Sequence, residues 1–182
     1  MLYWKSNLPQ GVPFCIDTHQ HISMIPGVFK MMLTVLKDEN IQPQHIRIPI
    51  EPLSPYLAMP SFYLTYNPIN IIKQWLLNFL WLFNKKVAMK HQITISYFLG
   101  VLFSGEMDEK RVLKILPKYC KLAEKSGADI EVLFHPGYME RPDHDFDAKN
   151  VVFDKFYLSH KRKTEFDSLM NLQKEVTVNA VS

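Results

Sequence analysis

Cysteine is scarce in this sequence, with two cysteines among 182 residues, Cys15 and Cys120. Neither lies in a CxxC or similar metal-knuckle spacing, so the cysteines indicate neither a disulfide framework nor a thiolate metal site. Each lies within an apolar stretch, which predicts buried free thiols. Free thiols in turn favour a reducing, cytoplasmic compartment.

Glycine and net charge are low as well. The six glycines form neither a GxGxxG nor a GxxxxGK[ST] pattern, which disfavours nucleotide cofactors. The 21 basic and 18 acidic residues are spread along the chain and leave a formal charge of +3. Nucleic-acid binders concentrate a much larger basic excess on one face, so we expect no nucleic-acid partner.

No apolar run is long enough to cross a membrane. The most apolar segment, residues 69–83, is interrupted by Asn70, Lys73, Gln74 and Asn78. Spanning a bilayer needs about 20 mostly apolar residues. We expect a helix buried on most sides, with an interfacial helix or a partner-docking surface as the alternative. The N-terminal residues also lack the pattern of a signal peptide.

The chain does contain a regular alternation of short apolar runs and helical patterns. Residues 51–67 are rich in proline and predict a loop. Asp108 and Gly127 suit the beginning and end of a helix. Strands are predicted at 12–17, 45–50, 93–103, 129–134 and 176–178, and helices at 26–40, 69–83, 108–127 and 161–172. This order predicts one α/β domain over residues 1–182, with a parallel sheet that is either open or the later part of an incomplete barrel.

Polar residues follow the first strand at the place where parallel α/β folds form active sites. If the chain stays extended, Asp17, His19 and His21 share one face, with neighbours about 6–7 Å apart. One carboxylate and two imidazoles suit Zn²⁺, Mn²⁺ or Fe²⁺. The alternative is a hydrogen-bonded strand end without a metal, and the spacing alone does not decide between the two.

His135 follows the apolar strand 129–134 and precedes Pro136 and Gly137. Taken alone, this position suits a structural histidine. A catalytic role is favoured because His135 and His19 are expected at the same end of one sheet. The second strand carries Arg47 and leads to Glu51. The other histidines, at positions 45, 91, 144 and 160, are expected to be bystanders, and the basic run 160–163 is expected to be a solvated helix start.

Three blocks of the sequence resemble the YdjC-like family, which includes chitooligosaccharide and hopanoid-pathway deacetylases. Residues 17–26 (DTHQHISMIP) resemble the family motif D-S-H-Q-H-x-H-x-x-P. Residues 98–107 (FLGVLFSGEM) and 131–137 (EVLFHPG) are similar to two later blocks, in the same order. Residues 156–169 are similar to the closing helix of the family.

The resemblance implies an irregular (β/α) barrel that removes the N-acetyl group from an acetylated sugar or oligosaccharide with one divalent metal, Mg²⁺ or Zn²⁺. It implies that His19 is a metal ligand and that His135 protonates the leaving amine. It places Asp17 in the catalytic set. His21, Arg47 and Glu51 would contact the substrate or support these groups. The expected reaction is attack of metal-bound hydroxide on the amide carbonyl.

The sequence departs from the family pattern at two places. Ser23 stands where the motif has its third histidine, and nothing matches the Asp-Asp motif and the further histidine ligand of the family. We therefore expect that the first strands of the barrel are missing and that this chain alone binds metal weakly. One alternative is a non-catalytic binding or structural paralogue, or a fragment that needs a partner chain. Another is a metallohydrolase that uses Asp17, His19, His21 and His135. A homo-oligomer is left open as a partner.

Overall fold

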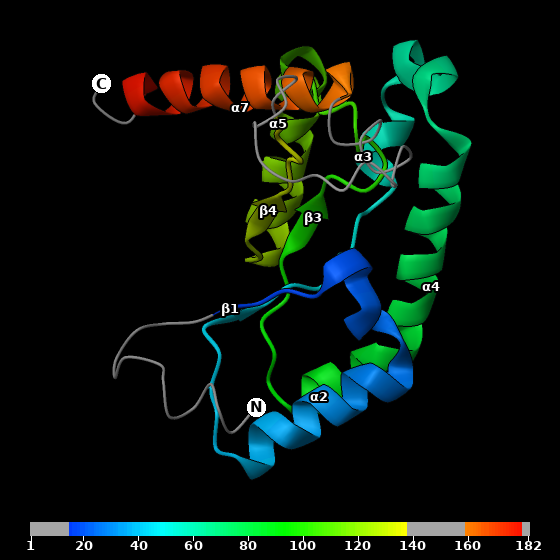
Figure 1. Ribbon diagram of the computed structural model, residues 1–182, viewed down its shortest axis with the longest axis vertical. Coiled ribbons are helices and arrows are strands. Elements are labelled where there is room, and N and C mark those ends of the chain that lie inside the picture. The colour runs from blue at the N-terminus through cyan, green and yellow to red at the C-terminus, as the bar shows by residue number, and fades with distance from the viewer. Residues whose placement is uncertain (1–14, 138–158, 180–182) are drawn as a thin grey trace, which may run out of the picture. The chain divides into compact units, whose positions relative to one another are not determined.

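The computed structural model describes residues 15–137 and 159–179 of the protein (Figure 1). The chain forms two compact units, Met1–Ile50 with Leu77–Ser96, and Glu51–Leu76 with Tyr97–Ser182. Helix α4 (Pro68–Lys90) contributes its first part to the second unit and its remainder to the first. The single domain expected over 1–182 stays a prediction.

The first unit contains a short parallel strand pair with helices in its connection. Strand β1 (Cys15–Ile16) pairs with β2 (His45–Ile46), and Ile16 lies opposite Ile46. The 3-10 helix η1 (His19–Met24) and helix α2 (Pro26–Asp38) connect them. Helix α2 begins at Pro26, whose fixed φ suits a first helical turn. The strands and helix predicted in this region are confirmed, although the second strand is shorter than expected and residues 12–14 of the first predicted strand lie outside the described residues.

The core of the first unit lies between α2, β2 and the later part of α4. Its buried apolar residues are Met24, Phe29, Leu33, Leu36, Ile46, Ile48, Leu77, Trp81 and Ala88. The buried Asn84 amide donates a hydrogen bond to the Met24 carbonyl oxygen over 2.8 Å. This bond satisfies the last carbonyl of η1 and ties α4 to it.

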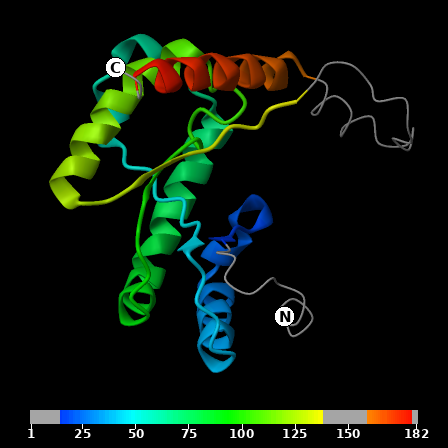
Figure 2. The same cartoon turned by 90° about the vertical axis from the view of Figure 1, so that its left-hand side faces the viewer.

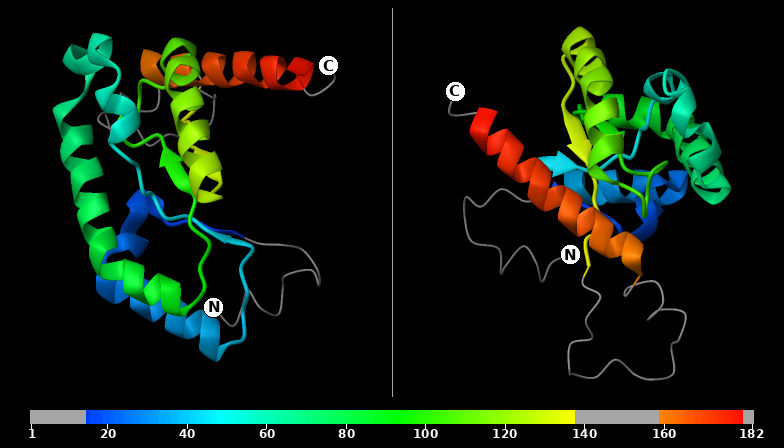
Figure 3. Two further views of the ribbon diagram at one scale, coloured as in Figure 1. Left: turned by 180° about the vertical axis from the view of Figure 1, so that it is seen from behind. Right: turned by 90° about the horizontal axis from the view of Figure 1, so that it is seen from above.

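The second unit contains another parallel pair, β3 (Tyr97–Leu99) with β4 (Ile130–Val132). Helix α5 (Glu109–Ser126) connects the two strands and packs against β4, α3 (Ser54–Leu57) and α7 (His160–Asn179). Figure 3 shows α7 crossing one end of α5. Figure 2 shows that the chain after β4 runs toward the first turn of α7.

Both predicted ends of α5 are confirmed. The Asp108 carboxylate accepts a hydrogen bond from the Arg111 backbone N–H over 2.9 Å, as an N-cap residue does. Gly127 ends the helix in a left-handed conformation with φ of 64°. Glycine adopts this conformation without the steric cost that a Cβ brings.

Strand β3 ends at Leu99 because the backbone changes direction at Gly100, where φ is 146°. A Cβ at position 100 would lie 2.7 Å from the Leu133 carbonyl oxygen, so only glycine fits where these two segments of the chain approach each other closely. The chain then turns through residues 101–105. The strand predicted at 93–103 is therefore confined to its three central residues.

Aromatic side chains form the centre of the core of the second unit. The rings of Tyr56 and Phe103 lie 5.2 Å apart in an edge-to-face arrangement, and Tyr119 meets Tyr56 edge-on at 6.2 Å. The other buried members of this cluster are Met59, Phe62, Leu99, Leu102, Met107, Val112 and Ile115. Edge-to-face pairs add to the stabilisation that the buried apolar area provides.

Several predicted elements are corrected by the structure. Residues 176–178 belong to helix α7 and not to a strand. The expected loop 51–67 contains α3 and the 3-10 helix η2 (Pro60–Thr65). Cys15 is exposed and Cys120 is half-buried, so the prediction of two buried thiols is wrong. Local apolar neighbours do not decide what packs over a residue.

The described strands form two separate two-stranded parallel sheets and no closed barrel. The protein is thus a mixed α/β structure in which helices predominate. None of the described helices combines the length and the apolar content needed to cross a bilayer.

The helix expected at 69–83 extends to Lys90 as α4 and is not buried on most sides. Trp81 is 8% exposed and Trp75 is 64% exposed. The other large apolar side chains that α4 leaves exposed are Ile69, Ile72, Leu76, Phe79, Leu82, Phe83 and Met89. The buried face includes the polar residues Gln74 and Asn84, whose amides bond to backbone carbonyls.

Candidate functional site

The segment that carries Asp17, His19 and His21 does not stay extended after β1. Gln20 and His21 adopt left-handed backbone conformations, with φ of 53° and 59°. The alternation of side chains that a strand imposes therefore ends before His19. The prediction that residues 17, 19 and 21 share one strand face is wrong.

A local hydrogen-bond pair explains this turn. The Thr18 hydroxyl accepts from the Ser23 backbone N–H over 3.1 Å and donates to the Ser23 hydroxyl over 2.8 Å. Threonine and serine side chains that bond to nearby backbone groups compete with strand ladders in this way. Ser23 is buried, so the residue that replaces the third histidine of the motif helps to close the turn.

Asp17 and Arg47 lie close together because each directly follows one of the two paired strands, β1 and β2. The Arg47 guanidinium donates a hydrogen bond to the Asp17 carboxylate and forms an ion pair with it. The Arg47 backbone N–H also donates to the Ile16 carbonyl oxygen over 2.9 Å, which extends the ladder by one bond. Arg47 therefore orients this carboxylate, and its supporting role in a site stays a prediction.

The described residues do not fit a complete metal site. His19 is exposed and His21 is half-buried. Among residues 15–137 and 159–179, no three His, Cys, Asp or Glu side chains gather closely enough to hold a metal ion. His19 and His135 lie in different compact units. The strands that precede them, β1 and β4, belong to two separate sheets, so the expectation that both histidines lie at the same end of one sheet is wrong.

Glu51 is a buried carboxylate that holds the turn after β3. It is 1% exposed. One oxygen accepts from the Tyr56 hydroxyl over 2.5 Å and from the backbone N–H of Gly100 over 2.9 Å. The same oxygen accepts from Val101 over 3.2 Å, and the other accepts from Leu102 over 2.8 Å. This geometry supports a role in fixing the turn and not a direct contact with substrate.

Burial raises the pKa of the Glu51 carboxyl, and its four hydrogen-bond donors oppose that rise. Burial and the nearby Glu51 carboxylate raise the pKa of Tyr56 and of Tyr119 well above the ordinary value. Both phenols therefore stay protonated and serve as hydrogen-bond donors. Tyr119 donates to the Phe98 carbonyl oxygen over 3.1 Å, which connects this buried polar group to β3.

His135 follows β4 and is held by a buried carboxylate on α7. The side chain of His135 is 31% exposed, whereas that of Glu165 is 0% exposed. The Glu165 carboxylate accepts from the backbone N–H of His135, and its second oxygen accepts from Met107 over 3.4 Å. The Nδ1 atom of His135 lies 3.5 Å from the Glu165 carboxylate.

Arg162 holds the same segment from the previous turn of α7. Its guanidinium donates to the His135 carbonyl oxygen over 3.0 Å, and its own carbonyl oxygen accepts from Gly137 over 3.3 Å. The basic run 160–163 begins α7 as expected, and three of its residues are exposed, whereas Arg162 is buried. Neither Arg162 nor Glu165 is among the site residues predicted from the sequence. Arg162, Glu165 and Ser168 follow one another at intervals of three residues, and this spacing indicates that they share one face of a helix.

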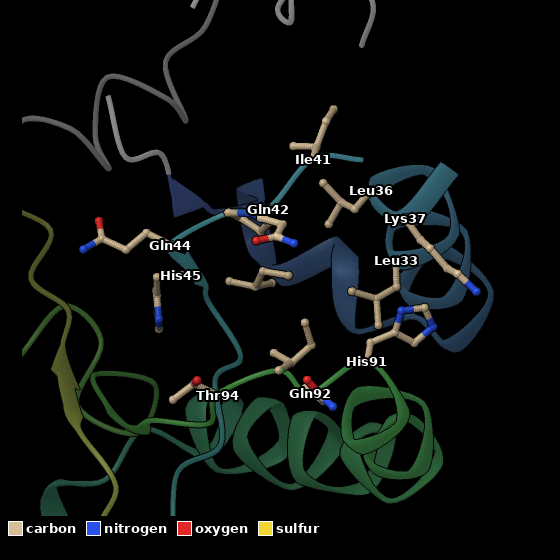
Figure 4. A pocket seen from close by; sticks show the side chains of 13 residues that line it. Leu33, Leu36, Lys37, Ile41, Gln42, Gln44, His45, His91, Gln92 and Thr94 are labelled. Atoms are coloured by element: carbon tan, nitrogen blue, oxygen red, sulfur yellow. The ribbon is translucent and has the colours of Figure 1, made fainter. Parts of the chain in front are cut away.

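A pocket of about 380 Å³ opens in the first unit between α2, the segment before β2 and the end of α4 (Figure 4). His45 and His91 line it, together with Leu33, Leu36 and Gln92. None of the residues that the sequence assigned to a site lines this pocket. The candidate catalytic residues therefore lie outside this pocket, with Asp17 in the first unit and His135 in the second.

Comparison with known proteins identifies one family. The family model described as YdjC-like protein matches residues 12–177. No curated protein and no solved structure matches the chain. The matched residues include both Asp17 with its turn and His135 with the helix that holds it. Because the match extends over most of the sequence, the chain belongs to the YdjC-like protein family.

Proposed function

We propose that the chain acts in the hydrolysis of N-acetyl groups on acetylated sugars or oligosaccharides. Membership of the YdjC-like family is consistent with this activity. The finer fold assignment, the later part of an irregular (β/α) barrel, belongs to the same proposal. The two parallel β-α-β units, β1 to β2 and β3 to β4, support it.

The geometry of His135 is the observation that carries the proposal. Hydrolysis of an amide needs a proton for the leaving amine, and histidine is the side chain best suited to supply it near neutral pH. His135 lies in the segment that follows the C-terminal end of β4 at Val132, and its side chain is partly open to solvent. Its backbone is fixed on both sides by charged groups of α7. A proton donor has to be positioned in this way.

Asp17 would serve as the second polar group of the reaction. Its carboxylate is half-exposed and is paired with Arg47. A solvent-accessible carboxylate that a guanidinium orients can accept a proton from an attacking water molecule. His21 would contact the substrate or support Asp17.

The family resemblance also implies a divalent metal, Mg²⁺ or Zn²⁺, with His19 as one ligand. When bound, such an ion polarises the amide carbonyl and acidifies a water molecule. The residues that the structure describes do not gather three ligands, so we derive no step through the metal.

Release of acetate from N-acetylated chitooligosaccharides tests the proposal. The chain is assayed after incubation with Mg²⁺ or Zn²⁺, and His135→Asn is compared with His160→Asn. His160 is an exposed residue of the same unit, so its substitution serves as the matched control. We expect His135→Asn to lower kcat by about 100-fold or more, as loss of a general acid does.

Equal acetate release by His135→Asn and the wild type would show that His135 is not the proton donor. Absence of acetate release from every N-acetylated sugar tested, with a folded wild-type chain, would favour the non-catalytic paralogue.

A further inference from the structure

We propose that Glu165 is a positioning residue that holds the His135 ring in the tautomer with its proton on Nδ1. This inference rests on the proposed function of His135, because it concerns which ring nitrogen faces the substrate. It assigns a role to a helix residue that neither the motif nor the family match assigns.

The environment of Glu165 requires hydrogen-bond donors. The side chain is 0% exposed, and a buried carboxylate without donors is strongly destabilised. Two backbone N–H groups, from Met107 and His135, reach it. These bonds anchor the loop before α5 and the loop after β4 to the same carboxylate. The buried Glu165 carboxylate is therefore a hydrogen-bond acceptor held in a fixed position next to His135.

The His135 ring offers its Nδ1 atom to this acceptor. Nδ1 is buried, and no group in the described part of the chain forms a hydrogen bond with it. The Glu165 oxygen, 3.5 Å away, is the acidic group paired with it. A distance of 3.5 Å is long for a hydrogen bond, and catalytic hydrogen bonds are often long in the absence of substrate. An ionised carboxylate only accepts hydrogen bonds, so a proton on Nδ1 satisfies both atoms.

The second contact of α7 limits movement of the segment. Arg162 donates to the His135 carbonyl oxygen, while Glu165 accepts from the His135 backbone N–H. The two polar groups of one residue are therefore bonded to adjacent turns of a single helix. Glu165 can then act on the ring and not only on the backbone, because the backbone has an independent anchor.

This arrangement fixes the direction of proton transfer. With one proton held on Nδ1, the Nε2 atom is the nitrogen that gains and loses a proton. In the doubly protonated ring, Nε2 donates its proton to the leaving nitrogen as the carbon–nitrogen bond breaks and its electron pair goes to nitrogen. The ring becomes neutral and keeps the proton on Nδ1. Carboxylate–histidine pairs serve this purpose in other hydrolases.

Nitrogen-15 NMR of the imidazole rings tests the tautomer directly. The spectrum is recorded on the whole chain labelled with ¹⁵N-histidine, at a pH where the rings are neutral. The His135 signals are assigned by their disappearance in His135→Asn. We expect a protonated Nδ1 and an unprotonated Nε2 in the wild type. In Glu165→Gln we expect a shift toward the tautomer with the proton on Nε2.

The kinetic measurement uses Glu165→Gln and a matched control, Ser168→Ala. Ser168 is also buried on α7, but its hydroxyl donates to the Thr164 carbonyl oxygen. We expect Glu165→Gln to lower kcat by about 10- to 100-fold with little change in KM, as loss of a group that orients a reacting residue does. Ser168→Ala should leave the tautomer and kcat unchanged.

A wild-type ring protonated on Nε2 would overturn the inference, and this result does not depend on whether the variant folds. Equal loss of kcat in Glu165→Gln and Ser168→Ala would also overturn it, since that pattern indicates general disturbance of α7. A wild-type ring protonated on Nδ1, in a chain that releases no acetate, would instead contradict the proposed deacetylase activity and leave the positioning role intact.

Discussion

Glu51 shows how one buried charge organises a turn. Its carboxylate receives hydrogen bonds from three successive backbone N–H groups and from Tyr56. These N–H groups follow β3, where the close approach at Gly100 prevents continuation of the strand. Without the carboxylate they would be buried and unpaired, which costs about 1–3 kcal/mol for each group.

We therefore expect Glu51→Gln to lower the free energy of unfolding by about 1–3 kcal/mol, and Glu51→Ala to lower it further. In the glutamine variant the NH2 group replaces one carboxylate oxygen. This group cannot accept a hydrogen bond, so at least one backbone N–H after β3 loses its acceptor. Urea denaturation measures the change. Glu124→Gln, at an exposed position of α5, is the control and should change it by no more than about 0.5 kcal/mol. Equal stability of the two variants would contradict the anchoring role.

The pH dependence of stability has a definite sign at this residue. Burial raises the pKa of Glu51 above its ordinary value of 4.5. A raised pKa means that the folded state holds the proton more tightly than the unfolded state does. Its contribution to stability is then fully present below pH 4.5 and declines as the pH rises through the folded pKa. Glu51→Gln should remove this decline, which denaturation at several pH values would measure.

Helix α4 shows that an apolar sequence does not tell which face of a helix is buried. Trp75 and Trp81 lie in the same run, yet only Trp81 is buried. The buried face also accepts Gln74 and Asn84, because each amide finds a carbonyl oxygen. The expectation of burial on most sides followed from composition, which carries no information on the neighbours of each face.

A pair of substitutions tests this orientation of α4. Trp81→Ala should lower the free energy of unfolding by about 3–5 kcal/mol, since it leaves a cavity in the core. Trp75→Ala removes an exposed ring and should change it by about 0.5 kcal/mol or less. Both values come from chemical denaturation followed by circular dichroism. A larger loss for Trp75→Ala than for Trp81→Ala would mean that α4 buries the opposite face.

Helix α7 makes the same point with polar residues. Arg162, Glu165 and Ser168 are buried, whereas the apolar Leu169 and Met170 are exposed. The polar face packs where the backbone groups of Met107 and His135 need partners. A helix can therefore bury its polar side when that side supplies the hydrogen bonds that two loops lack.

For the whole molecule, metal binding separates the hypotheses left open by the sequence. Because the described residues do not gather three ligands, we expect the isolated chain to bind Zn²⁺ weakly, with a Kd above about 1 µM. Calorimetric titration of the wild type, His19→Ala and the control His160→Ala measures this. His19→Ala should weaken binding further.

One tight equivalent that is lost in His19→Ala would contradict the weak site. It would show that ligands assemble around His19 and would favour a metallohydrolase with a site of its own. Tight binding that His19→Ala leaves unchanged would mean that His19 is not a ligand.

The sequence by itself determined the order and the type of most elements. Apolar periodicity located α2, α4, α5 and the four strands, and Asp108 and Gly127 marked the ends of α5 correctly. These features depend on neighbours within a few residues, whose physical preferences are readable locally. The motif around Asp17 and the block ending at His135 also identified the family.

Only the tertiary structure decided which side chains meet. The turn at Thr18 and Ser23, the anchor at Glu51 and the contact of Glu165 with His135 each depend on where hydrogen-bond partners lie in space. The backbone N–H groups that bond to Glu51 and Glu165 come from residues 30 or more positions away. Burial makes such pairing necessary, and no local pattern records which distant donor will be present.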